Sequence, residues 1–379
     1  MKIVYVVPVL APYAIPRFQE LAKIDGVEVH VIVEKATSSD RIGWKFEEIE
    51  GVTTHLIKKN YAHKFIKNNK NGNYLQNDEH IFPIGIRKIL KKINPNVVIV
   101  CNASQLLMLL GPRKYKLGII IEDTLRADEG RKPLNKFIKK LLLKTADFYC
   151  PFSEDSIDYL NAYGFKDKLI RSSWSIDNKD FSQITENEKK TFIKAKRISD
   201  DKIKFLIIAN LIKLKGICEF LNSWEKLPEE KLSKFELLIA GEGSERKNIE
   251  DTIKQYNLDN VSLLGHVEYS DIKKYLQVVD VFVLPTLEDL NSLSVYEALA
   301  ASKPLLISKY NGSKFLVIEN KNGFIFDPYS INDTVDKIIS ISKANLTEMS
   351  KFSCELSKKY TNKVVMNKFY NDLLNLYSI

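Results

Sequence analysis

Short apolar runs rich in valine and isoleucine recur along this chain, and helical segments separate them. In the first half the predicted strands are residues 3–7, 27–33, 97–100, 117–122 and 148–152, and the predicted helices are residues 16–23 and 84–93. Strands that alternate with helices usually form a parallel sheet covered by helices on both faces. The sequence therefore predicts an α/β fold, in which ligands bind at the carboxyl ends of the strands.

The chain has 379 residues, which is too long for one compact core and fits two α/β domains. The periodicity is lost around residues 169–181, and the alternation resumes at residues 204–209. We therefore expect a first domain at residues 1–180 and a second at 181–360. Residues 361–379 carry an amphipathic helix at 365–377.

Composition places the chain among soluble globular proteins, with 45% hydrophobic and 28% charged residues. No run of eighteen apolar residues occurs and the N-terminus lacks a signal-peptide pattern, so no membrane-spanning helix is expected. The four cysteines, Cys101, Cys150, Cys218 and Cys354, are scattered without metal-ligand spacing. They predict neither a disulfide framework nor a zinc site, and they favour a reducing cytoplasm.

Positive charge is concentrated in two segments of a chain with a net charge of +9. Residues 58–70 mix bases with aromatic side chains, and residues 131–144 form a basic amphipathic pattern. The second segment fits an anionic membrane surface. The alternative is a solvated helix whose apolar side packs on the sheet. Nucleic acid is disfavoured as a partner because no nucleic-acid-binding motif is present.

The most informative segment for function follows the predicted buried strand 281–284. Asp289 precedes a small polar loop, and Glu297 lies inside the helix predicted at 295–301. This spacing places one carboxylate on each side of a helix N-terminus, where free backbone N–H groups attract phosphate. Carboxylates suit sugar hydroxyls, so the segment indicates a nucleotide-sugar site.

This segment resembles the Glu-x7-Glu motif of retaining family-4 glycosyltransferases, with Asp289 and Glu297 at the two acidic positions. Further segments resemble that family in order and spacing, namely residues 237–243, 261–267, 303–307 and 322–328. The resemblance covers nearly the whole chain. It implies two Rossmann-like domains (the GT-B fold) that face a central cleft, with a C-terminal helix that crosses back to the first domain.

The resemblance also assigns roles to residues of the motif. Glu297 would hold the ribose hydroxyls, and Asp289 would face the transferred sugar, with the neighbouring Glu288 as the alternative first acid. The loop that leads into the helix would offer backbone N–H groups to the diphosphate through Asn291, Ser292, Leu293 and Ser294.

Other donor residues are expected after the first three strands of the second half. Lys215 matches the lysine that compensates the leaving diphosphate, and Asn210 stands where the family usually has an arginine. Gly241 belongs to a Gly-x-Gly that follows an apolar strand. His266 and Val267 lie where the family places the nucleobase.

In the first half, Glu122 follows a strand at the position where many relatives have a histidine near the reacting sugar. A carboxylate there can hold a sugar hydroxyl or support positive charge at the anomeric carbon. Arg17 follows a glycine-free loop and either faces an anionic acceptor or is exposed.

Together these features predict an enzyme that transfers a sugar, with retention, from a UDP- or GDP-linked donor to a glycan or lipid-linked acceptor. We expect a role in bacterial surface polysaccharide or glycoconjugate assembly, in the cytoplasm or at the inner face of the plasma membrane. Neither a metal nor a further cofactor is implied. The alternatives are a nucleotide-sugar 2-epimerase on the same fold and a non-catalytic nucleotide-sugar-binding subunit. A dinucleotide-binding Gly-x-Gly-x-x-Gly is not present, which disfavours a dehydrogenase.

Overall fold

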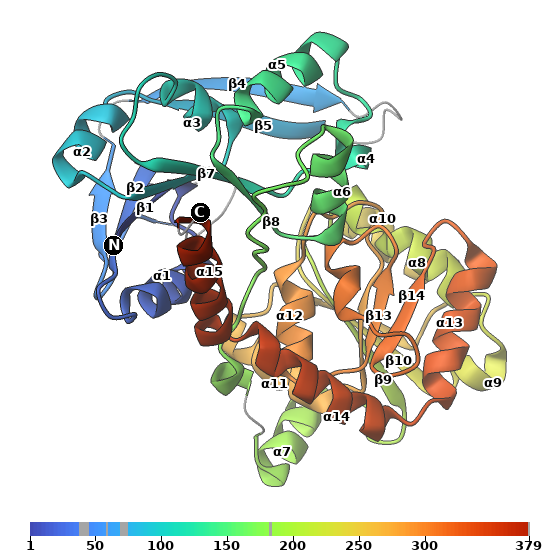
Figure 1. Ribbon diagram of the computed structural model, residues 1–379. Coiled ribbons are helices and arrows are strands. Elements are labelled where there is room, and N and C mark those ends of the chain that lie inside the picture. Colours follow the sequence, from blue (N-terminus) through green and yellow to red (C-terminus); the bar gives the residue numbers. More distant parts are fainter. Residues whose placement is uncertain (38–44, 58–59, 69–74, 182–183, 378–379) are drawn as a thin grey trace. The chain divides into compact units, whose positions relative to one another are not determined.

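A computed structural model describes residues 1–37, 45–57, 60–68, 75–181 and 184–377 (Figure 1). By their internal contacts, the residues divide into two compact units. Unit 1 is Met1–Ser175 together with Asn362–Ile379, and unit 2 is Ile176–Thr361. Each unit has its own sheet and its own core, so each is described by itself.

Unit 1 is built on a parallel six-stranded sheet with the order β3-β2-β1-β6-β7-β8. Its strands are β1 (Lys2–Val9), β2 (Glu28–Lys35), β3 (Thr53–Leu56), β4 (Asn60–Asn68), β5 (Leu75–Pro83), β6 (Val97–Val100), β7 (Lys116–Ile121) and β8 (Phe148–Pro151). Its helices are α1 (Ile15–Ala22), α2 (Ile86–Ile93), α3 (Ala103–Met108), α4 (Leu125–Asp128), α5 (Pro133–Leu143), α6 (Glu154–Ala162) and α15 (Asn362–Tyr377), with the 3-10 turn η1 (Pro12–Ala14). Strands β4 and β5 form a separate antiparallel hairpin.

The strands of this sheet are continuous apolar runs because helices bury both faces. In β1, Val4 and Val6 point into one core cluster, while Ile3, Tyr5 and Val7 point into the other. This alternation is the two-residue period of a strand. The register aligns Val6 with Ile32 on one side and with Val100 on the other.

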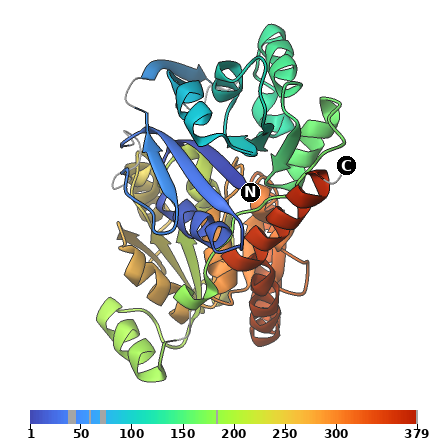
Figure 2. The same cartoon turned by 60° about the vertical axis from the view of Figure 1, so that its left-hand side comes forward.

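The C-terminal helix α15 belongs to unit 1 and packs beside α1 (Figures 1 and 2). Its apolar side is buried, and the Phe369 ring lies 6.4 Å from the Tyr5 ring. The Tyr377 hydroxyl donates to the Asn96 carbonyl at 2.6 Å. The predicted return of this helix to the first domain is thus confirmed.

Unit 2 repeats the architecture, with a parallel six-stranded sheet in the order β11-β10-β9-β12-β13-β14. Its strands are β9 (Ile203–Ile208), β10 (Phe235–Ala240), β11 (Val261–Gly265), β12 (Val281–Leu284), β13 (Leu305–Ser308) and β14 (Gly323–Phe326). Its α-helices are α7 (Glu186–Lys196), α8 (Ile217–Trp224), α9 (Glu229–Leu232), α10 (Arg246–Gln255), α11 (Tyr269–Val278), α12 (Leu293–Ala300), α13 (Ile331–Lys343) and α14 (Leu346–Ser357). Its 3-10 turns are η2 (Asn178–Phe181), η3 (Lys213–Lys215), η4 (Gly312–Leu316) and η5 (Lys358–Tyr360). The core of unit 2 is centred on Trp224, which is fully buried against Phe205 and Phe235.

In each sheet, successive strands are added first on one side of the central strand and then on the other. This reversal occurs between β1 and β6 in unit 1 and between β9 and β12 in unit 2. At such a reversal the loops that follow the two central strands diverge, and the space between them is the usual ligand site of an open α/β sheet. The two-Rossmann-domain prediction is confirmed, and in unit 2 the residues that follow β9 and β12 occupy this position.

Helix α5 does not agree with the interpretation of residues 131–144 as a helix whose apolar side packs on the sheet. The buried residues of α5 are Lys139 and Leu143, whereas its larger apolar side chains are exposed. The interpretation that the apolar side of this helix packs on the sheet is therefore wrong for Leu134, Phe137, Ile138 and Leu141. Among the described residues, no helix is both long and apolar enough to cross a bilayer.

The basic segment at residues 58–70 is described only in part. Residues 58–59 and 69–70 lie outside the described residues, and the backbone between them forms β4. The sequence did not predict β4 and β5.

Candidate functional site

The candidate site lies in unit 2 where the central strands β9 and β12 end. After β9 the chain makes the turn η3, which carries Lys215, and after β12 it runs through Asp289 into helix α12. These residues are 74 positions apart in sequence, but β9 and β12 are neighbours in the sheet. The parallel topology therefore brings a cation and a carboxylate to one edge of the sheet.

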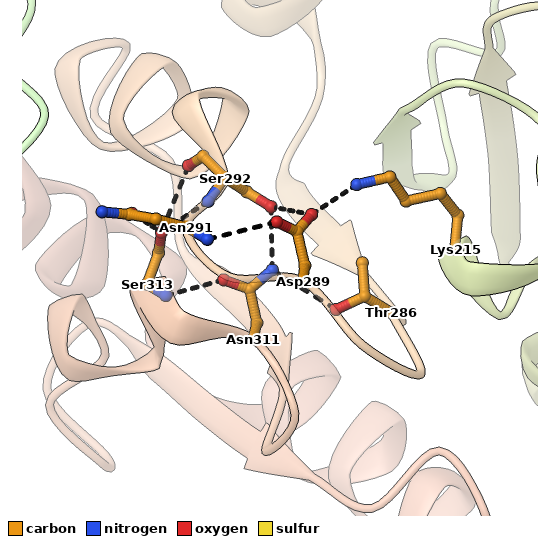
Figure 3. A network of polar contacts seen from close by, with 7 residues as sticks. All are labelled: Lys215, Thr286, Asp289, Asn291, Ser292, Asn311 and Ser313. Atoms are coloured by element: carbon orange, nitrogen blue, oxygen red, sulfur yellow. Dashed lines mark hydrogen bonds and ion pairs between the residues drawn. The ribbon is translucent and has the colours of Figure 1, made fainter. Parts of the chain in front are cut away.

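Lys215 and Asp289 form an ion pair at the centre of this site (Figure 3). The Lys215 ammonium donates to Asp289 Oδ2, and the Ser292 hydroxyl donates to the same oxygen. The backbone N–H of Asn291 donates to Asp289 Oδ1 at 3.2 Å. A carboxylate that accepts several hydrogen bonds is fixed in place. The structure thus brings together four of the predicted residues.

A second layer of buried polar side chains supports this pair (Figure 3). The Asn311 amide donates to Ser292 Oγ at 2.9 Å and to Thr286 Oγ1 at 3.3 Å. The Ser313 hydroxyl donates to Asn291 Oδ1 at 2.6 Å. Asn311 and Ser313 are fully buried, so their hydrogen bonds hold the loop that carries Asp289.

Asn311 and Ser313 were not predicted from the sequence. They flank Gly312 in the polar turn that follows β13, a buried strand at the same sheet edge. A polar Asn-Gly-Ser turn after a central apolar strand was the signal that could have identified them.

The two loops of the site are also joined through their backbones. The Leu287 N–H donates to the Leu214 carbonyl at 2.8 Å. Gly216 has a φ of +64°, and a Cβ atom there would lie 2.1 Å from the Pro285 carbonyl oxygen. The turn that carries Lys215 therefore reaches the loop after β12 only because residue 216 has no side chain.

The N-terminus of helix α12 opens at the same place. Ser292 is the N-cap residue, but its hydroxyl is used by Asp289 and the helix has no side-chain cap. The N–H groups of the first helical turn, which includes Leu293 and Ser294, cannot be used by carbonyls of the helix itself. Together with the Lys215 ammonium, this helix end is suited to a bound anion.

Glu297 lies further along α12 and has different neighbours. Its side chain is 7% exposed, and its hydrogen-bond and charge partners are Tyr269 and Lys273 of α11. Burial raises the pKa of the Glu297 carboxyl to about 7, although the Tyr269 hydroxyl and the Lys273 charge oppose the rise. The described contacts of Glu297 therefore lie with α11 and not with the Lys215–Asp289 pair.

The remaining predicted donor residues follow β9, β10 and β11 in turn, at the same sheet edge. Asn210 is exposed after β9. Gly241 has a φ of +146°, and a Cβ atom there would lie 1.9 Å from the Ala209 carbonyl oxygen, which gives this glycine a packing role. The His266 ring is 74% exposed, 3.4 Å from Glu268, and Val267 is half-buried. Their contact with a donor remains a prediction.

Glu122 belongs to unit 1 and is half-buried at the carboxyl end of β7. It lines a cavity of about 520 Å³ together with Arg17 and Lys139. Its predicted action on the transferred sugar remains a prediction.

Residues 188–360 match the family model of glycosyl transferases group 1. Three uncharacterised glycosyltransferases of Methanocaldococcus jannaschii are 25%, 30% and 23% identical over 35%, 40% and 56% of this chain. The chain spans 38%, 40% and 53% of their lengths. An N,N'-diacetylbacillosaminyl-diphospho-undecaprenol alpha-1,3-N-acetylgalactosaminyltransferase of Campylobacter jejuni is 28% identical, over 58% of this chain and 57% of its own.

Solved structures resemble the fold over the full chain. A glycosyltransferase from Rickettsia africae has a TM-score of 0.74 at 17% identity, with 99% of this chain and 98% of that chain covered. HepE of Anabaena, solved in complex with UDP, has a TM-score of 0.72 at 13% identity, with both chains fully covered. The whole chain therefore has the GT-B fold, and residues 188–360, which hold the Lys215–Asp289 pair, are similar to the glycosyl transferases group 1 family.

Proposed function

We propose that this chain is a retaining glycosyltransferase that moves a sugar from a nucleoside-diphosphate donor to a glycan or lipid-linked acceptor. The observation that carries the proposal is the Lys215–Asp289 pair beside the N-terminus of α12. A diphosphate at this helix end meets backbone N–H groups and one ammonium, while the fixed carboxylate is placed to accept hydroxyl donors.

In this proposal, Lys215 stabilises the leaving diphosphate. Negative charge grows on the phosphate oxygen as the bond to the anomeric carbon breaks, and a fixed cation stabilises that charge. Asp289, fixed by Ser292 and the Asn291 N–H, orients the transferred sugar by accepting from its hydroxyls. Retention is part of the proposal because of the resemblance to retaining enzymes.

Two of the similar proteins support the proposed substrates. The Campylobacter relative is named for a diphospho-undecaprenol acceptor, and HepE was solved with UDP. We therefore propose a UDP-linked donor, with GDP as the alternative, and a lipid-linked or glycan acceptor in bacterial surface glycoconjugate assembly. The proposed location is the cytoplasmic face of the plasma membrane, where a lipid-linked acceptor would be met.

The proposed function is tested by incubating the protein with a panel of UDP- and GDP-sugars, with and without lipid-diphosphate sugar acceptors. Acceptor-dependent release of nucleoside diphosphate is expected, and NMR of the product should show the donor's anomeric configuration. Release of nucleotide with interconversion of the free sugar at C2 would instead indicate an epimerase. Binding of nucleotide sugar without release under any condition would indicate a binding subunit.

The proposed role of Glu297 predicts that the affinity for the nucleotide depends on pH. A carboxylate that accepts from ribose hydroxyls must be ionised, and the pKa of this carboxyl is about 7 in the free protein. Below that pH the nucleotide has to displace a proton, so its affinity should fall by up to tenfold per pH unit and level off above about pH 8.

Calorimetric titration of wild type and Glu297→Gln with UDP between pH 5.5 and 8.5 checks this prediction. The variant should bind more weakly at pH 8.5, by about tenfold, which corresponds to one lost charge-assisted hydrogen bond. Titration of the phosphate itself affects both proteins equally, so the difference between them isolates Glu297. Equal affinities across the range would exclude Glu297 from the nucleotide site.

Helix α5 supports attachment of the enzyme to a membrane surface. Leu134, Phe137, Ile138 and Leu141 have the spacing of one helix face and are 67%, 59%, 46% and 46% exposed. Lys132, Lys136, Lys140 and Lys144 recur every fourth residue along the same helix. Lys139, which belongs to the same basic segment, is buried and pairs with Asp123. Exposed apolar side chains with flanking lysines fit an anionic bilayer.

We expect the protein to float with anionic vesicles at low salt and to be released at high salt, because each lysine contributes roughly 1 kcal/mol that salt screens. The double variant Lys136→Glu and Lys140→Glu should lose this binding. The matched control, Lys351→Glu and Lys358→Glu, makes the same charge change at exposed lysines of unit 2 and should float like wild type. Equal recovery with neutral and anionic vesicles would leave α5 without a membrane role.

A further inference from the structure

The second candidate site is the cavity in unit 1, which lies at the reversal point of its sheet. It has a volume of about 520 Å³ and is lined by the carboxyl ends of β1, β6 and β7 together with α1, α5 and the segment around Trp174. Met366 of α15 also lines it. The cavity is large enough for one or two sugar rings, and open α/β sheets bind ligands in this position.

Arg17 is the most distinctive residue of this cavity. It lies on α1, and its side chain is only 8% exposed. The guanidinium carbon lies 5.2 Å from the centre of the Phe152 ring and 5.3 Å from that of Trp174, and Nη2 donates to the Ser172 hydroxyl at 3.2 Å. The two rings and this hydrogen bond fix the guanidinium plane, which lowers the entropy lost when it binds a ligand.

Two further cations and two carboxylates line the cavity, and a third carboxylate lies beside it. Lys139 donates to Asp123, and Arg131 lies 3.7 Å from the same carboxylate and 2.8 Å from Asp128, so these two cations form ion pairs with two carboxylates. Glu122 is the second carboxylate of the lining. The cavity therefore combines a fixed guanidinium among aromatic rings with a carboxylate able to accept from hydroxyls.

We infer that this cavity binds a sugar that carries a carboxylate or phosphate group, with Arg17 as the residue that recognises the anion. A planar guanidinium matches the geometry of either anion through paired hydrogen bonds. Glu122 would accept from the hydroxyls of the ring, and the aromatic side chains would cover its apolar face. The inference rests on the proposed function only in identifying this sugar as the acceptor.

The test compares charged and neutral sugars of the same shape. Methyl glucuronide and glucose 6-phosphate supply the carboxylate and the phosphate, and methyl glucoside is the neutral probe. Their binding is measured by ligand-observed NMR titration, and UDP binding is measured in the same samples. The variants are Arg17→Gln, Arg17→Lys and the control Arg113→Gln, whose guanidinium pairs with Asp147 near the amino end of β7.

At least one anionic probe should bind wild type roughly tenfold more tightly than methyl glucoside, the factor of one charge-assisted contact. Arg17→Gln should abolish this difference, Arg17→Lys should restore part of it, and Arg113→Gln should keep it. The control matters because both glutamine variants reduce the positive net charge by one. UDP affinity should be unchanged in all variants.

Equal binding of charged and neutral probes to wild type, or no binding of either anionic probe, overturns the inference even if Arg17→Gln fails to fold. A charge preference that survives in folded Arg17→Gln also overturns it. The proposed function is judged separately, because its failure appears as absent UDP binding in samples that still bind the anionic sugar.

Discussion

Replacing Lys215 with alanine is expected to lower kcat by about 10²–10³, with a smaller change in donor affinity. The ammonium of Lys215 faces a growing negative charge only while the bond between the sugar and the diphosphate breaks, so its removal affects the transition state most. Asp289 keeps the donors Ser292 and Asn291 in this variant, so the loop and the fold should persist.

Lys213→Ala is the matched control for this prediction. Lys213 lies in the same turn, but its ammonium pairs with Glu219 and not with Asp289. Steady-state kinetics of both variants should show a change of less than about threefold for Lys213→Ala, which is the effect of a partly exposed ion pair. A Lys215→Ala enzyme with near-normal kcat and a raised KM would show that Lys215 binds ground state and transition state equally.

The sequence could predict this pair because topology decides it. Lys215 and Asp289 each follow an apolar strand, and the loops that follow parallel strands lie at the same edge of the sheet. Asn311 and Ser313 were harder to predict because their roles depend on hydrogen bonds between loops that periodicity does not describe. For Glu297, spacing places the residue on α12 but does not show that Tyr269 and Lys273 of α11 face it.

For the fold, too, periodicity predicted the elements that are apolar runs and did not predict what depends on packing. Strands buried on both faces, such as β6 and β12, are short runs of apolar residues and were predicted within one or two residues. Strand β3 was missed because Thr53–Leu56, at the edge of its sheet, has no apolar run. Helix α5 was predicted as a helix, but periodicity cannot tell whether its apolar side faces a core or the solvent.

Replacing Gly216 with alanine should destabilise unit 2 by roughly 2–5 kcal/mol, combining left-handed backbone strain with overpacking. The added Cβ would lie 2.1 Å from the Pro285 carbonyl oxygen, and the Leu287 side chain is 3.0 Å away. Neither the turn nor the strand end can move without shifting Lys215 or the loop of Asp289. The midpoint of thermal unfolding should therefore fall by about 5–15 °C, and residual enzyme should turn over slowly even well below that midpoint.

Two further substitutions separate collision from backbone strain at this position. Gly130→Ala adds a methyl group where no atom lies within 4 Å, and it should leave the unfolding midpoint unchanged. Gly216→Asn tolerates the left-handed conformation better than alanine but carries the same Cβ. If the collision with Pro285 dominates, asparagine should destabilise unit 2 at least as much as alanine does. If Gly216→Asn recovers most of the stability, the left-handed backbone is the reason for glycine at this position, and the close approach of the two loops is not. Gly216 would then have no role in bringing Lys215 and Asp289 together.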